Sequence, residues 1–139
     1  KNTIRETARR TPIFDVEMPS LWKSGGISDA ELVQKATTFA DSYVPFTKNY
    51  GVTGTLKHQA ANRYVNLFQR LNGYRGFEFN QYFNNNISLG IGNRGFLDMV
   101  NHKTKTIYDM KFGNADWRPG QFQKYQRNFN NYNIFKIKP

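Results

Sequence analysis

The stretch from Gly95 to Gly113 constrains the fold of this chain more than any other part of its sequence. Two apolar runs, Phe96–Val100 and Thr106–Phe112, lie on either side of the polar segment Asn101–Lys105. β-Branched and aromatic flanks around a segment of turn composition are typical of a β-hairpin. We therefore expect two antiparallel strands joined by a short turn.

The register of this hairpin decides which side chains meet. If Lys103 and Thr104 form the tip, Asp98 stands opposite Asp109. Directly opposed residues share one face of the sheet, with their Cβ atoms about 5 Å apart. Lys111 is two residues beyond Asp109, so it shares that face as well. The pattern therefore brings two carboxylates and a lysine together on one side of an apolar hairpin.

Such a cluster is better suited to chemistry than to stability. Two adjacent carboxylates repel each other unless a cation lies between them. A hard divalent ion such as Mg²⁺ takes carboxylate oxygens, waters and substrate phosphate oxygens, and Mn²⁺ is the alternative. We expect Asp98 and Asp109 to hold the ion with a main-chain carbonyl near Met110. Lys111 would orient the attacking water, which suggests metal-assisted hydrolysis of a phosphodiester.

Leu97-Asp98, ten further residues and then Asp109-Met110-Lys111 resemble the motif of the PD-(D/E)xK nuclease superfamily, with Leu97 where that motif has proline. A longer resemblance, over about residues 50–139, is to nuclease domains at the C-termini of bacterial polymorphic toxins (Rhs-type and related secreted effectors). It is carried by four segments: GTLKH (54–58), FNQYFNNN (79–86), GNRGFLD (92–98) and IYDMKFG (107–113).

The resemblance implies a restriction-endonuclease-like α/β (α+β) fold, in which a small mixed sheet carries the catalytic hairpin between helices. The two acids would bind Mg²⁺ or Mn²⁺, and the lysine would assist the water. The implied activity is that of a DNase toxin without sequence specificity, used in interbacterial competition. Its implied partners are DNA, a larger carrier protein or secretion machinery, and a cognate immunity protein, which we expect to be acidic. A secreted or delivered effector of this kind acts in the cytoplasm of the target cell.

The distribution of charge agrees with a polyanionic partner. The net charge is +10, and residues 51–139 hold thirteen Lys and Arg against four Asp and Glu, whereas residues 1–50 hold seven against six. A basic surface on the predicted nuclease part favours nucleic acid or an acidic protein as the partner. Cysteine is absent, which excludes disulfides and thiolate metal sites. No apolar run approaches the ~20 residues of a membrane span.

The organisation along the chain is that of one domain. Residues 1–27 are predicted to be an arm or linker, and 28–139 a nuclease domain with its core motifs in 51–139. Because the sequence begins with Lys, we expect it to belong to a longer chain. The predicted helices and strands are a capped helix from Ser28 to before Pro45, a helix over about Thr55–Leu71 after a turn at Gly51–Thr55, a strand over Phe77–Phe83, a helix over about Gln121–Asn128 and a strand over Ile134–Ile137.

Other residues are candidates for accessory roles. Superfamily members often carry a helical acid into the metal site, but the second predicted helix has none, so that role is vacant or taken by another residue. His58 is a candidate for contact with substrate or with a metal-bound water. His58 could equally bond only its neighbours. Glu78 is a candidate third carboxylate or the partner of a surface arginine. Gln121 and Lys124 on the helix after the hairpin resemble an accessory active-site feature of the superfamily.

DNA backbone contacts are expected from Arg94, Lys124 and Arg118. The run Gly90–Gly95 matches G-x-G-x-x-G, but it leads into a strand rather than a helix, so we reject a dinucleotide site. Two other functions stay open. One is a metal-independent ribonuclease with His58 and His102 as base and acid. The other is a non-catalytic nucleic-acid-binding module whose surface aromatic residues stack on bases.

Overall fold

The computed structural model describes residues 26–84 and 94–139. Nearly all of the predicted arm and most of the glycine-rich run at 90–95 lie outside the described residues. The described residues form three helices and a four-stranded mixed sheet, which confirms the predicted α/β class. Along the chain these are α2 (Asp29–Tyr43), α3 (Tyr50–Asn72), β1 (Phe77–Asn84), β2 (Arg94–Asn101), β3 (Thr106–Met110), α4 (Gln121–Asn128) and β4 (Asn133–Ile137).

Helix α2 begins as its sequence predicts. The Ser28 hydroxyl accepts a hydrogen bond from Glu31 N at 3.1 Å, and the Glu31 carboxylate accepts one from Ser28 N at 3.0 Å. This capping box satisfies amide groups that the first turn leaves without partners. Beyond it, Leu32, Val33 and Ala36 are fully buried and pack in the core that α2 shares with α3.

Helix α3 begins at Tyr50, five residues before the predicted start, so the predicted turn over Gly51–Thr55 is wrong. The cause is the cap at Asn49. Its side chain accepts from Val52 N at 3.0 Å, and the Thr53 hydroxyl donates to Asn49 O at 2.9 Å. A good cap stabilises a helix by about 1 kcal/mol, which offsets much of the cost of glycine in its first turn.

The sheet has the order β1-β2-β3-β4. Strands β1, β2 and β3 are antiparallel neighbours, whereas β4 lies parallel to β3 after the connection through α4. The predicted hairpin register is confirmed by three pairs, in which Met99, Val100 and Asn101 stand opposite residues 108, 107 and 106. At the turn, Asn101 Oδ1 accepts from Lys103 N at 3.0 Å, and Lys105 adopts a left-handed φ of 52°.

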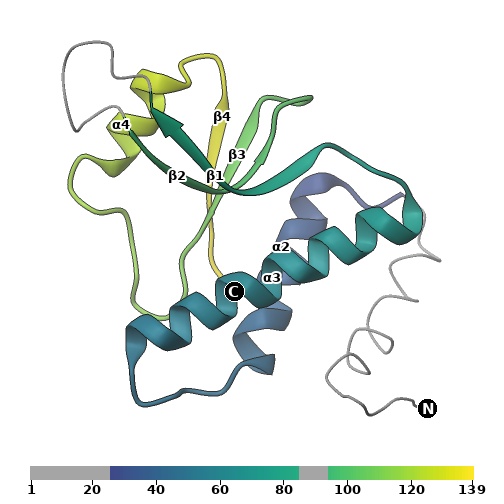
Figure 1. Cartoon of the computed structure of the whole chain (residues 1–139), viewed down its shortest axis with the longest axis vertical. Coiled ribbons are helices and arrows are strands. Elements are labelled where there is room, and N and C mark those ends of the chain that lie inside the picture. Colours follow the sequence, from purple (N-terminus) through teal and green to yellow (C-terminus); the bar gives the residue numbers. More distant parts are fainter. Residues whose placement is uncertain (1–25, 85–93) are drawn as a thin grey trace.

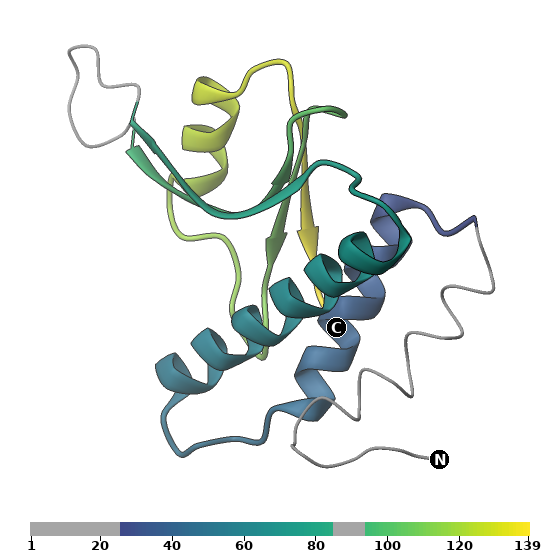
Figure 2. The same cartoon turned by 45° about the vertical axis from the view of Figure 1, so that its right-hand side comes forward.

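The sheet lies between two helical layers (Figures 1 and 2). Met99 and Tyr108 belong to the core with α2 and α3, while their neighbours Val100 and Ile107 belong to a second core with Tyr125 of α4. Because successive strand residues point to opposite faces, α2 and α3 cover one face and α4 the other. Within the described residues, no helix is both long and apolar enough to cross a membrane.

The β1–β2 hairpin bends away from β3 and β4 in both views (Figures 1 and 2). Asn80 has a left-handed φ of 50°, a conformation that asparagine tolerates better than most residues. Ladder pairs stand on both sides of this bend, at Phe79 and Gln81, but Asn80 itself has none, and the position opposite it is Asp98. Pairing of β2 with β3 also stops at Met99. Asp98 therefore lies where the two halves of the sheet diverge.

Candidate active site

The structure brings Asp98, Asp109 and Lys111 together at this divergence. Asp98 Oδ2 accepts a hydrogen bond from Met110 N at 3.3 Å, which holds its carboxylate beside that of Asp109. Lys111 Nζ lies 2.8 Å from Asp109 Oδ2. Asp109 and Lys111 are almost completely buried, with 3% and 8% of their surface exposed, whereas the Asp98 side chain is 25% exposed. Asp98 is thus the side from which solvent or substrate reaches the pair.

The two carboxylates cannot both be ionised without cost. Burial raises the pKa of Asp109, the adjacent Asp98 raises it further, and Lys111 opposes both, which leaves the pKa at about 7. Burial also acts to raise the pKa of Asp98, but hydrogen bonds with His58 and Asp109 hold it below its usual value. Near neutral pH the pair therefore carries a proton that Asp109 readily gives up when positive charge approaches.

His58 of α3 lies beside Asp98, on the more exposed side of the site. Its Nε2 lies 2.9 Å from Met110 O and 3.2 Å from Asp98 Oδ2, while its Nδ1 lies 2.8 Å from Gly54 O. Every one of these neighbours is an acceptor, so both ring nitrogens carry protons. Burial alone would lower the pKa of His58, but the Asp98 carboxylate raises it to about 9. An imidazolium thus lies between a carboxylate and a main-chain carbonyl.

Helix α4 positions Lys111 from the other side. Gln121 Oε1 accepts from Lys111 Nζ at 3.1 Å and from Arg118 N at 3.0 Å. The Lys111 ammonium group also lies 5.1 Å from the centre of the Trp117 ring. Gln121, a predicted site residue, is therefore a direct neighbour of the predicted catalytic lysine.

Sequence analysis did not assign Trp117 or Tyr125 to the site. Gln121 Nε2 donates to the Tyr125 hydroxyl at 3.3 Å, which in turn donates to Phe96 O on β2 at 3.1 Å. The available signal was the spacing of four residues between Gln121 and Tyr125, which puts both on one helix face. That spacing predicts a core contact equally well, so only the folded chain identifies this link between α4 and the strand of Asp98.

Two predicted residues lie elsewhere. Glu78 accepts a hydrogen bond from Gln81 on its own strand, and Gln81 is also a neighbour of His102. His102 follows β2 and lies four residues beyond Asp98, roughly 13 Å along the strand at 3.3 Å per residue. His58 contacts Asp98 itself. The structure therefore does not bring His58 and His102 together as the acid–base pair that the ribonuclease alternative requires.

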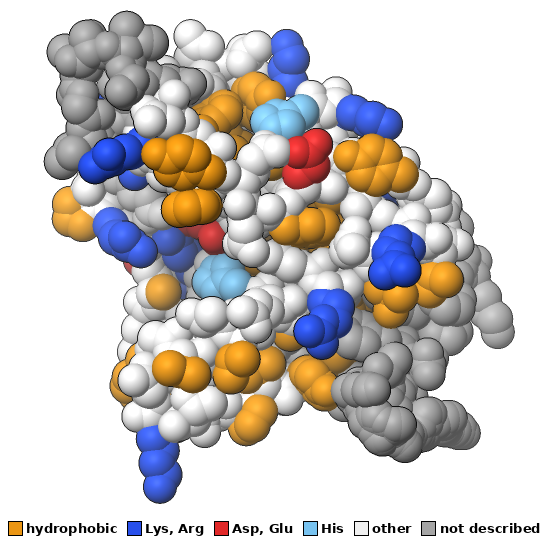
Figure 3. All heavy atoms as spheres, viewed as in Figure 1, with side chains coloured by type: hydrophobic (Ala, Val, Ile, Leu, Met, Phe, Trp, Pro, Cys, Tyr) orange, Lys and Arg blue, Asp and Glu red, His pale blue; other side chains and the backbone are white. Residues whose placement is uncertain are grey.

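Basic side chains lie on the β2 and α4 side of the site. Arg94 and Arg118 are exposed, and Lys124 Nζ approaches β2 so closely that a Cβ atom added at Gly95 would lie 3.2 Å from it. Figure 3 shows Lys and Arg side chains along the left of the view, near a histidine and an acidic side chain in the region between α3 and the β1–β2 hairpin. Of the predicted backbone-binding residues, Arg94 and Arg118 are thus exposed and Lys124 is partly buried beside β2.

The oxygen donors in the site fit a hard divalent ion. Asp98 and Asp109 offer carboxylates, and Met110 offers the main-chain carbonyl that now accepts from His58. The described residues contain no group of three or more His, Cys, Asp and Glu side chains that could hold a metal ion. Mg²⁺ typically binds one or two carboxylates and completes its shell with waters and substrate phosphates. The donor set therefore fits an ion that binds together with substrate.

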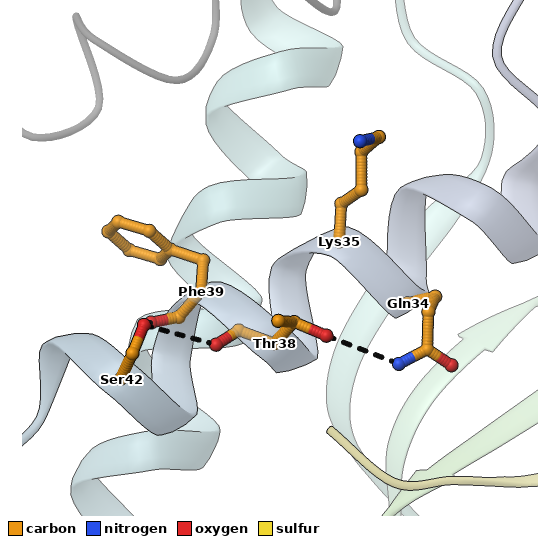
Figure 4. A pocket seen from close by; sticks show the side chains of 5 residues that line it. All are labelled: Gln34, Lys35, Thr38, Phe39 and Ser42. Carbon is orange, nitrogen blue, oxygen red and sulfur yellow. Dashed lines mark hydrogen bonds between the residues drawn. The ribbon is translucent and has the colours of Figure 1, made fainter.

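A separate hollow of about 340 Å³ lies along α2 (Figure 4). Its lining residues are spread along the helix. The Gln34, Thr38 and Ser42 side chains bond to each other or to the backbone, as Gln34 Nε2 does to Thr38 Oγ1 at 3.3 Å and to Lys138 O at 2.7 Å. No acid, histidine or metal-ligand set lines it. We assign it no chemistry.

Comparison of the chain with protein-family models, with curated proteins and with solved structures finds no match.

Proposed function

We propose that this chain is a metal-dependent nuclease of the PD-(D/E)xK type, with a restriction-endonuclease-like fold, that hydrolyses phosphodiester bonds of DNA. Asp98, Asp109 and the Met110 carbonyl would hold Mg²⁺ or Mn²⁺. When bound, the ion would lower the pKa of a water molecule and neutralise the scissile phosphate. The toxin resemblance adds the proposed setting: delivery into a target cell and inhibition by an acidic immunity protein.

The observation that carries the proposal is the placement of two adjacent carboxyl groups in a largely buried site. Asp98 and Asp109 are adjacent and largely buried, and the single ammonium group of Lys111 does not prevent the pKa of Asp109 from rising to about 7. A site built only for stability would not place a second carboxylate there. A divalent cation would remove the repulsion and release the proton of Asp109.

The protein groups have distinct roles in the proposed reaction. A water molecule would lose a proton to solvent as its oxygen attacks phosphorus; the bond from phosphorus to the leaving oxygen would break, and that oxygen would take up a proton from solvent. Lys111 orients the water and stabilises the negative charge that develops on the phosphoryl oxygens. Gln121 is a positioning residue, since its Oε1 fixes Lys111 Nζ and is itself fixed by Arg118 N. Arg94, Arg118 and Lys124 bind the backbone without reading bases.

We propose that His58 occupies the place of the helical acid that members of the PD-(D/E)xK superfamily often carry into the metal site. In the free protein its imidazolium supplies positive charge between Asp98 and the Met110 carbonyl. We propose that His58 turns toward substrate phosphate when the divalent ion binds. This exchange keeps the carboxylates neutralised in both states.

A nicking assay with purified protein and supercoiled plasmid tests the proposal. We expect relaxed and linear DNA in Mg²⁺ or Mn²⁺ and intact plasmid in EDTA. Cleavage that is unaffected by EDTA would contradict metal dependence, and no cleavage under any condition would contradict the nuclease function.

A further inference from the structure

Two aromatic side chains lie exposed beside the candidate active site. Tyr82 on β1 and Phe96 on β2 are cross-strand partners, and 51% and 62% of their surfaces are exposed. Their ring centres are 5.1 Å apart with the planes tilted by 54°. Exposure of two large rings costs free energy in water, since each could otherwise bury apolar area.

This pair is continuous with the site through β2. Exposure alternates along the strand, with Arg94, Phe96 and Asp98 more open than Gly95 and Leu97 between them. The alternation puts Arg94, Phe96 and Asp98 on one face, at intervals of roughly 7 Å. A cation, an aromatic ring and a site carboxylate therefore follow one another in a line.

The strand that carries Phe96 is anchored to α4 on the side opposite the exposed ring. The Tyr125 hydroxyl donates to Phe96 O at 3.1 Å, which ties this part of β2 to α4. Glycine at position 95 lets the Phe83 ring and Lys124 Nζ pack closely against β2, because a Cβ atom there would lie 3.3 Å from the ring and 3.2 Å from Nζ. Phe96 thus has a fixed backbone and a free ring face, which lowers the entropy lost on binding.

We propose that Tyr82 and Phe96 form a stacking surface for unpaired bases, so that the site acts preferentially on single-stranded or locally melted nucleic acid. This inference rests on the proposed function for its substrate class. Bases in a duplex are already stacked and paired, and their faces are not available to a protein ring. Aromatic rings beside a basic path are the arrangement by which proteins bind single strands. The adjacent Arg94, on the same face of β2, supplies the charge complementarity that selects a nucleic acid over an apolar partner.

Binding in EDTA tests this independently of cleavage. Fluorescence anisotropy would compare a labelled oligothymidylate of about fifteen nucleotides with a duplex of equal length, using the full chain. The variants are Tyr82→Ala, Phe96→Ala and the conservative Phe96→Trp. The matched control is Tyr50→Ala, because Tyr50 is 86% exposed and packs on Phe46 at 4.9 Å in a second exposed aromatic pair.

Wild type is expected to bind the single strand more tightly than the duplex. Phe96→Ala should weaken single-strand binding about tenfold, with little change for duplex, while Phe96→Trp and Tyr50→Ala retain wild-type affinity. The slope of log K against log salt should be unchanged in Phe96→Ala, because stacking releases no counterions. Arg94→Ala should reduce that slope by about 0.7.

Three results would overturn the inference. The first is unchanged single-strand affinity in Tyr82→Ala and Phe96→Ala, and the second is an equal loss of affinity for single strand and duplex. The third is a wild-type dimer in light scattering that Phe96→Ala dissociates. The last would show that the rings cover a second copy of the chain. A protein that binds single strands through these rings but cleaves nothing would support the stacking surface for unpaired bases and contradict the nuclease proposal.

Discussion

The pKa of Asp109 responds to burial and to two charged neighbours, Asp98 and Lys111. Burial and the Asp98 carboxylate raise its pKa, and Lys111 at 2.8 Å only partly compensates, so its proton is lost near pH 7. For His58 burial acts in the opposite direction and lowers the pKa, but the same Asp98 carboxylate raises it to about 9. Both groups therefore hold protons in the folded state that they lose at lower pH in the unfolded chain.

The raised pKa values of Asp109 and His58 predict that the metal-free protein loses stability as pH rises. For Asp109 the loss falls between its ordinary pKa of 3.8 and the folded value of about 7. For His58 it falls between 6.5 and about 9. In each window the folded state binds more protons than the unfolded state, so unfolding becomes more favourable with pH. Thermal melts in EDTA should show Tm falling from about pH 5 to about pH 9.

The Asp109→Asn variant separates the contributions of Asp109 and His58 to the pH dependence of Tm. The amide does not titrate, so this variant should lose most of the fall below about pH 7 and keep the fall above it. Parallel curves for wild type and variant would show that Asp109 does not carry the shared proton.

The position of His58 predicts a specific response to metal. His58→Glu would place a third carboxylate beside Asp98 and the Met110 carbonyl, where His58→Gln places a neutral group of equal length. Without metal, His58→Glu should be less stable than His58→Gln by about 1–3 kcal/mol, because like charges are buried together. Saturating Mg²⁺ or Mn²⁺ should raise the Tm of His58→Glu more than that of His58→Gln, since ligand binding stabilises the folded state. Equal responses in differential scanning fluorimetry would contradict a cation position next to His58.

At the scale of elements, one buried amide joins α3 to β1. Gln69 is 3% exposed, and its Oε1 accepts from the backbone N–H groups of Arg75, Gly76 and Phe77 at 3.0, 3.1 and 2.9 Å. Three backbone donors at the start of β1 thus share one oxygen atom. This contact sets where β1 begins relative to the helix that carries His58.

Replacement of that oxygen should be costly. Gln69→Leu removes the acceptor of these three backbone N–H groups, of which those of Gly76 and Phe77 are buried, and is expected to lower the free energy of unfolding by about 3 kcal/mol. Gln69→Glu keeps the oxygen that the three N–H groups need but replaces the Nε2 donor, which bonds at 3.4 Å to Asn66 Oδ1 and to Phe77 O; at a pH where its carboxyl is protonated and can donate to one of them, it should cost less. Urea denaturation measures both, and an equal cost for the two variants would show that volume rather than the acceptor matters.

The elements that could be predicted from sequence are those with local signals. The capping box at Ser28, the register of β2 with β3 and the bounds of α4 follow from spacing within a few residues. The start of α3 could not be predicted, because the glycines near it indicate a turn while the Asn49 cap and the packing of the helix determine the outcome. The bend at Asn80 likewise has no local sequence signal that separates it from an ordinary strand position.

At the scale of the whole molecule, the candidate site is a junction of α3, the β2–β3 hairpin and α4. Asp98, Asp109 and Lys111 could be predicted to converge, since strand periodicity and a hairpin register suffice. The contacts of His58 with Asp98 and of Gln121 with Lys111 require knowledge of how helices on opposite faces pack around the hairpin. The same packing brings Trp117 and Tyr125 beside the site, and sequence spacing alone assigns such residues to the core.

The most direct measurement compares wild type with Asp109→Ala and Lys111→Ala in a plasmid-nicking assay with Mg²⁺ and an EDTA control, and with a structured RNA in parallel. Asp116→Ala is the matched control, because Asp116 is an exposed acid that pairs with Lys136 at 2.9 Å outside the site. We predict metal-dependent DNA cleavage in wild type and Asp116→Ala, and its loss in both site variants. Cleavage of RNA alone that the same variants abolish would keep the site and change its substrate. Undiminished cleavage by Asp109→Ala and Lys111→Ala, or no cleavage of either nucleic acid by wild type, would contradict the proposed active site.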